Sequence, residues 1–101
     1  TPQPAPEGAR HIYNQYVIRV PGEHRDGIRG RLEEANIGNE VYYPRCIHQQ
    51  DCYRGLGYAA GDFPHSERAS RETIAIPIYP ELSEGQKQYV VDTVLAAVRS
   101  I

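Results

Sequence analysis

An apolar stripe near the end of the chain constrains the fold more than any other feature. Five aliphatic residues recur at helical spacing and so fall on one face of a helix. They are Val90, Val91, Val94, Leu95 and Val98. Ser83 and Gln86, three apart and just before the stripe, form the pattern of a capping box that begins such a helix. The chain therefore needs a second element against which this apolar face can pack.

Alternating side chains predict the strands. Residues 11–20 are rich in Ile, Val and Tyr and form the first strand, which a Pro-Gly pair ends. Two shorter strands are predicted at 40–43 and 73–78. Neighbouring strand residues point to opposite faces of a sheet, so one of Tyr42 and Tyr43 is expected to pack beneath it and the other to offer its hydroxyl above.

Helices are predicted between these strands. One covers residues 23–35, after which Asn36 is expected in the left-handed conformation that ends a helix. A second covers 63–72 with Asp62 as its cap, and a short helical turn is expected near 49–54. The order of the elements predicts an α+β fold, in which helices pack on a small mixed or antiparallel sheet of about three strands.

Composition excludes several classes of function. The 11 Lys and Arg residues nearly balance the 13 Asp and Glu residues, and no basic run marks a nucleic-acid surface. No apolar run approaches the roughly 20 residues that span a bilayer, so no membrane partner is expected. Two cysteines are too few for a disulfide framework, which favours a cytoplasmic setting.

The first residues resemble a linker rather than part of a domain. Residues 1–10 are rich in proline, which enters sheets and helices poorly. The chain contains no methionine, and we interpret it as an excised domain covering 11–101.

Four segments, taken in order, carry a resemblance to a known family. They are His11-Ile12-Tyr13-Asn14-Gln15-Tyr16-Val17-Ile18-Arg19, Gly38-Asn39-Glu40-Val41-Tyr42-Tyr43-Pro44, Gly61-Asp62-Phe63-Pro64 and Ile76-Pro77-Ile78-Tyr79-Pro80-Glu81-Leu82. Together they resemble the C-terminal domain of the DegT/StrS family of sugar aminotransferases, which depend on pyridoxal phosphate and have the type I aminotransferase fold. The resemblance covers nearly the whole chain.

The resemblance implies a parent enzyme that is larger than this chain. The parent would transfer an amino group from glutamate to a keto nucleotide-sugar and would act as a homodimer. Its large domain would hold pyridoxal phosphate as a Schiff base on a lysine. The one lysine present, Lys87, falls on an exposed face of the last helix. We therefore expect this domain to close the substrate side of the cleft, to bind the cofactor weakly at best and to be inactive alone.

The resemblance also implies three substrate-binding residues, Tyr42, Tyr43 and His48. The tyrosines would face the nucleotide-sugar, since a phenol donates a hydrogen bond and offers a ring for stacking. Without the resemblance, both are ordinary strand tyrosines with hydroxyls in water, and His48 is more simply explained by a hydrogen bond within its loop. No catalytic or cofactor-binding residue is predicted.

A metal site is not expected. Cys46, His48 and Cys52 lie within seven residues, but their spacing is not a usual zinc pattern and no second cluster supplies a fourth ligand.

Two other classes of function stay open on the sequence alone. A degenerate family member would bind a nucleotide-sugar without any chemistry. An interaction module of the same fold would use its tyrosine-rich surface to bind a protein.

Overall fold

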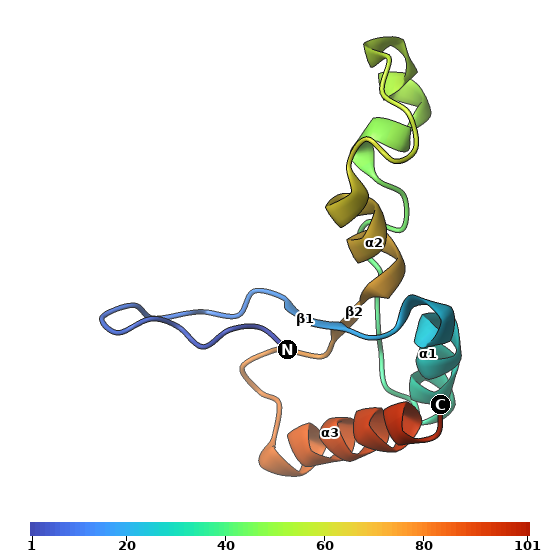
Figure 1. The fold of residues 1–101 in the computed structure, drawn as a ribbon. Helices are drawn as coiled ribbons and strands as arrows, with labels where there is room; N and C mark the ends of the chain where they lie inside the picture. Colours follow the sequence, from blue (N-terminus) through green and yellow to red (C-terminus); the bar gives the residue numbers. More distant parts are fainter.

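The computed structural model describes residues 1–101 and divides into a base and an arm (Figure 1). The base contains the two strands, α1 and α3. The arm, residues 44–72, rises away from it, and residues 1–15 extend to one side without forming a helix or a strand. In chain order the elements are β1 (Tyr16–Arg19), η1 (Gly22–His24), α1 (Arg25–Glu34), η2 (Ile47–Gln49), η3 (Asp51–Leu56), α2 (Pro64–Glu72), β2 (Thr73–Ile76) and α3 (Glu84–Arg99), where η marks a 3₁₀ helix.

The sheet has two antiparallel strands, which confirms the α+β class but not the third strand. Strand β1 pairs with β2, and the predicted strand at 40–43 is reduced to a single bridge between Glu40 and Ala75. Its extension is blocked at both ends. The N–H of Thr73 donates to the carbonyl of Ala69 in the last turn of α2, and Pro77 has no N–H to donate. On either side of Ala75, this edge of the sheet therefore offers no free N–H with which a third strand could pair.

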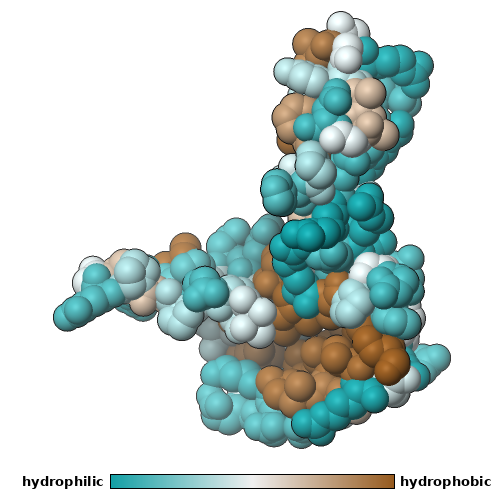
Figure 2. All heavy atoms as spheres, viewed as in Figure 1, coloured by the Kyte–Doolittle hydropathy of each residue, from teal (hydrophilic) through white to brown (hydrophobic).

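The core lies where α1 and α3 meet the sheet, and Figure 2 shows apolar surface gathered over this part of the molecule. Its eight buried residues are Ile18, Val20, Ile28, Leu32, Ile37, Ile74, Val90 and Ala97. The predicted stripe on α3 is only partly buried, because Val91 and Leu95 are exposed. These two residues lie about 100° further round the helix than Val90 and Val94. A helix that packs mainly against one neighbour, here α1, buries a narrower face than the stripe covers.

Local sequence signals set the ends of the helices in the base. Asn36 has a φ of 56°, as predicted, and the N–H groups of Asn36 and Ile37 donate to the carbonyls of Glu33 and Leu32. This pair of bonds is a Schellman motif. The capping box of α3 is also present, with the N–H of Gln86 donating to Ser83 Oγ over 3.2 Å.

The start of α2 differs from the prediction. Pro64 occupies the first turn as expected, but the capping position belongs to Phe63, which offers no side-chain hydrogen bond. The carboxylate of Asp62 instead accepts a hydrogen bond from the N–H of Ala59 over 2.8 Å. Asp62 thus closes the turn before the helix and does not cap it.

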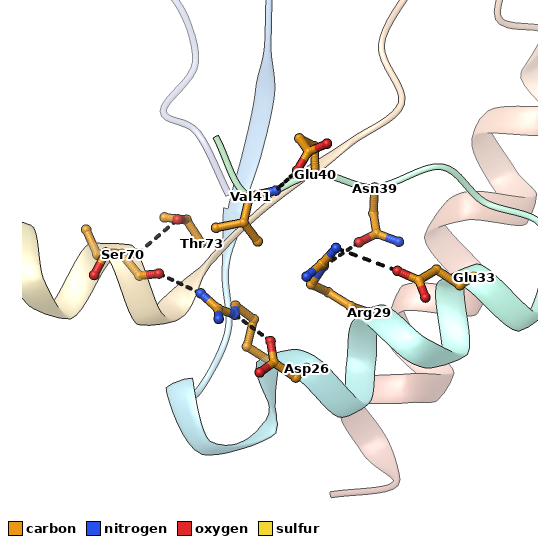
Figure 3. A network of polar contacts seen from close by, with 10 residues as sticks. Asp26, Arg29, Glu33, Asn39, Glu40, Val41, Ser70 and Thr73 are labelled. Atoms are coloured by element: carbon orange, nitrogen blue, oxygen red, sulfur yellow. Dashed lines mark hydrogen bonds and ion pairs between the residues drawn. The ribbon is translucent and has the colours of Figure 1, made fainter. Parts of the chain in front are cut away.

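Two arginines on α1 fix the segments that flank the sheet (Figure 3). The Nε of Arg29 donates to Asn39 Oδ1 over 2.7 Å, next to the bridge at Glu40. Arg25 donates to the carbonyl of Ser70 near the end of α2. Helix α1 therefore holds both the chain that enters the arm and the chain that leaves it.

None of the helices combines the length and the apolar content that crossing a bilayer requires.

Candidate functional site

A groove of about 670 Å³ opens where the arm joins the sheet. The three predicted substrate-binding residues, Tyr42, Tyr43 and His48, all line it. The segment 40–43 brings the tyrosines from the sheet edge, whereas η2 in the arm supplies the histidine. The fold thus brings the three residues to one surface.

Tyr42 and Tyr43 are both accessible, with 49% and 67% of their surface exposed. Their hydroxyls make no hydrogen bond within the chain, whereas the hydroxyl of Tyr89 donates to the carbonyl of Ala35 over 3.1 Å. The expectation that one tyrosine packs beneath the sheet is wrong, because this segment leaves the ladder after Glu40. Both phenols are therefore available to a ligand.

Tyr42 borders a second cavity besides the groove. That cavity, about 620 Å³, lies beside the end of β2 and the start of α3, and Tyr42 lines it as well. Tyr16, Tyr79 and Tyr89 contribute further aromatic surface there. One tyrosine side chain thus borders two hollows of similar size.

His48 is held inside the arm. Its Nε2 lies 2.9 Å from Glu67 Oε1, and its ring lies against that of Phe63 with 4.8 Å between the centroids. Only 7% of the His48 side chain is exposed, so it forms part of the wall of the groove without projecting into it. The hydrogen bond of His48 therefore goes to helix α2, and not to its own loop as the simpler explanation had predicted.

Glu67, which contacts His48 behind the groove, is the residue of the candidate site that the sequence did not reveal. It is 8% exposed, and its Oε1 also accepts a hydrogen bond from the N–H of Gly61 over 2.7 Å. That N–H is the largest cause that lowers the pKa of Glu67 from its ordinary 4.5, while burial acts to raise it and the hydrogen bond from His48 adds to the lowering. An acid in the first turn of a helix is common for its own sake, so sequence offers little warning of this contact.

The lining of the groove is aromatic and hydroxylic rather than charged. Glu40 is the only acidic residue among the lining residues, and no lysine or arginine is among them. The aromatic residues are Tyr42, Tyr43, Tyr53, Tyr58 and Phe63. Such a surface can stack on a ring and hydrogen-bond to hydroxyls, but it offers no cation to a phosphate.

The residues present do not fit the Schiff base of pyridoxal phosphate. Lys87 lies on α3, half exposed, with its Nζ 2.6 Å from Glu84 Oε1, and it lines neither cavity. An amine in this setting is a solvated surface cation and not the shielded nucleophile that the cofactor needs.

The cysteines form no metal cluster. Cys46 is buried and Cys52 is exposed, both are free thiols, and no group of three potential ligands occurs in the chain. His48 is engaged with Glu67 instead.

Sequence comparison finds curated relatives of this chain. A curated relative, the "Pleiotropic regulatory protein" of Geobacillus stearothermophilus, is 41% identical over 88 residues, which are 87% of this chain and 23% of the relative. A dTDP-3-amino-3,4,6-trideoxy-alpha-D-glucose transaminase of Micromonospora megalomicea subsp. nigra is 30% identical over 96 residues, which are 94% of this chain and 25% of that enzyme. The chain spans about a quarter of the length of these relatives.

Solved structures agree with the sequence relatives. The crystal structure of DesV from S. venezuelae superposes with a TM-score of 0.87 at 27% identity, covering 99% of this chain and 26% of DesV. An aminotransferase from Brucella abortus gives a TM-score of 0.82 at 27% identity, covering 94% of this chain and 25% of that enzyme. A sequence model of the DegT/DnrJ/EryC1/StrS aminotransferase family matches residues 1–95, and the chain belongs to this family.

Proposed function

We propose that this chain is the C-terminal small domain of an aminotransferase that depends on pyridoxal phosphate and transfers an amino group from glutamate to a keto nucleotide-sugar. Residues 11–101 form the domain and residues 1–10 the linker to a large domain of the same polypeptide. The domain closes the substrate side of the cleft. Support comes from family membership and from two relatives that are named as transaminases of dTDP-linked amino sugars.

The observation that carries the proposal is the shared groove of Tyr42, Tyr43 and His48. The two free hydroxyls suit hydrogen bonds with sugar hydroxyls, and the exposed rings suit stacking on a sugar or a base. The residues act by orienting the substrate, because none of them is activated as a nucleophile or paired with one. A diphosphate needs cations that this groove lacks, so its charge would be met by residues outside the chain.

The cofactor supplies the electron sink for the amino transfer when it is bound to the parent enzyme. In our proposal its binding site lies in the large domain, because Lys87 is a surface residue paired with Glu84. The parent is a cytoplasmic homodimer, and the small domain alone is inactive. Its own part is to hold the sugar and to exclude water from one side of the cleft.

A titration followed by NMR tests the site. We expect dTDP-glucose and UDP-N-acetylglucosamine to shift the backbone signals of Tyr42 and Tyr43, with weak affinity because the chain supplies only part of the pocket. Y42F and Y43F should reduce the response. Tyr13 lines neither cavity, so Y13F is the matched control and should leave the response unchanged. Equal shifts throughout the chain, or none, would contradict the proposal.

A second candidate is an interaction module that performs no chemistry. Ile47, Leu56 and Tyr58 expose apolar surface around the groove, and such surface suits a protein partner. The relative from Geobacillus stearothermophilus is named as a regulatory protein. Absence of any shift with either nucleotide-sugar favours this candidate. If the sugars do bind, the coding sequence upstream of Thr1 separates an active parent from a degenerate one, since only the former needs a Schiff-base lysine.

A further inference from the structure

Glu67 is the only charged residue among the twelve buried residues of the chain. A buried carboxylate is unfavourable unless hydrogen bonds compensate for its lost hydration. Two compensating donors meet one atom, Oε1, which lies 2.7 Å from the nitrogen of Gly61 and 2.9 Å from Nε2 of His48. The buried charge of the arm therefore lies in contact with His48, a residue that lines the groove.

This contact determines which nitrogen of His48 carries the proton. An ionised carboxylate only accepts hydrogen bonds, so the hydrogen between the two side chains belongs to Nε2. In the neutral ring Nδ1 is then an acceptor without a hydrogen. It has no hydrogen-bond partner in the chain, and no buried side-chain nitrogen or oxygen lacks one, so Nδ1 keeps contact with solvent.

We propose that Glu67 is a positioning residue that holds His48 in the Nε2–H form, so that Nδ1 accepts a hydrogen bond from a sugar hydroxyl in the groove beside Tyr42 and Tyr43. This inference rests on the proposed function for its ligand, but not for the state of His48. A tyrosine hydroxyl can donate or accept, whereas Nδ1 in this form can only accept. His48 would therefore favour a ligand that presents a hydroxyl over one that lacks it.

The same carboxylate also shapes the loop before α2. Gly61 has a φ of +96°, a conformation that other residues rarely adopt, and its N–H points at Glu67 Oε1. Removing the acceptor would release both the loop and the histidine ring. A test must therefore separate loss of the tautomer from general loss of structure.

The first measurement is the tautomer itself, in the 101-residue chain labelled with ¹⁵N-histidine. With the ring in its neutral form, we expect His48 to show a protonated, pyrrole-type shift at Nε2 and a pyridine-type shift at Nδ1. A reversed pattern, or the averaged shifts of a freely exchanging imidazole, would overturn the proposal.

Variants show whether Glu67 is responsible. E67L removes the acceptor and should give averaged His48 shifts. E67Q keeps an oxygen, which the N–H of Gly61 orients toward Nε2, and should restore the Nε2–H form. The control is E72L: Glu72 lies on the same helix and pairs with Arg19, but it does not line the groove. An E67L chain with wild-type His48 shifts, or an E72L chain with averaged ones, would overturn the assignment. If E67L fails to fold, the wild-type and E67Q spectra still show whether His48 holds the Nε2–H form beside an oxygen acceptor, and its absence from either would overturn the proposal.

Binding of dTDP-glucose tests the ligand. Loss of one hydrogen bond predicts affinity about five- to ten-fold weaker in E67L, with E67Q and E72L close to wild type. A wild-type chain with the Nε2–H form but no response to dTDP-glucose would overturn the proposed function and the ligand assigned to Nδ1. The wrong tautomer with intact binding would overturn this inference alone.

Discussion

Replacing Ile74 with alanine should remove a large share of the free energy of unfolding and disorder the groove with it. Ile74 is fully buried at the centre of β2, adjacent to Ala75, which bridges to the segment that carries the tyrosines. The substitution deletes three carbon atoms, worth about 2.4 kcal/mol in transfer free energy at ~0.8 kcal/mol each. The cavity left behind raises the expected loss to about 3–4 kcal/mol.

That loss is large for a chain of this size. A 101-residue domain has a free energy of unfolding of about 5–15 kcal/mol, and only twelve of its residues are buried, which favours the lower end. We therefore expect I74A to lose half or more of its stability. The conservative I74V should lose only about 0.5–1.5 kcal/mol.

Urea denaturation followed by circular dichroism measures these differences, and dispersion of the Tyr42 and Tyr43 NMR signals reports on the groove. The matched control is I78A, because Ile78 follows the same strand but is exposed. A loss below about 1 kcal/mol for I74A, well under the range for buried isoleucine, would refute the packing argument. So would an equal loss for I78A.

Three further predictions concern the cap, the buried acid and the cofactor. S83A removes the capping box of α3 and should lower the free energy of unfolding by about 1 kcal/mol, measured in urea, with S66A, which removes a serine that makes no cap, as the control. The lowered pKa of Glu67 means that its stabilising contribution is present above its ordinary pKa of 4.5 and is lost as the pH falls through the folded-state value. Acid titration by circular dichroism should therefore show a stability loss below pH 4.5 that is smaller in E67Q, and identical curves would contradict the contact. Pyridoxal phosphate mixed with the chain should give neither transaminase activity nor a tight, borohydride-trappable adduct on Lys87, and such an adduct found by mass spectrometry would show that the cofactor assignment is wrong.

The sequence predicts those features that depend on neighbouring residues. The capping box at Ser83 and the left-handed turn at Asn36 are both confirmed, because each is a backbone geometry set within one helical turn. The third strand is not predicted correctly, since it depends on whether the N–H of Thr73 is free. That N–H is bonded in the last turn of α2, and no pattern in residues 40–43 indicates that it is occupied.

The site was accessible to sequence reasoning only in part. The residue pattern alone left Tyr42 and Tyr43 as ordinary strand residues, and the family resemblance was needed to select them together with His48. Neither the residue pattern nor the family resemblance identified Glu67. It lies 19 residues from its partner His48, and an acid in the first turn of a helix is common for its own sake. Its importance depends on burial, which follows from how the loop at Gly61 folds over it.

The base and the arm are stabilised by different kinds of contact, and this difference bears on function. The base holds the eight buried apolar residues of the core, whereas the buried residues of the arm are only Cys46 and Glu67. The arm therefore depends on the bonds around Glu67 and on the contacts among His48, Phe63 and Tyr58. Single contacts of this kind stabilise a fold far less than an apolar core does. The wall of the groove can thus rearrange around a ligand while the base stays folded, as the proposed closure of this domain over a substrate would require.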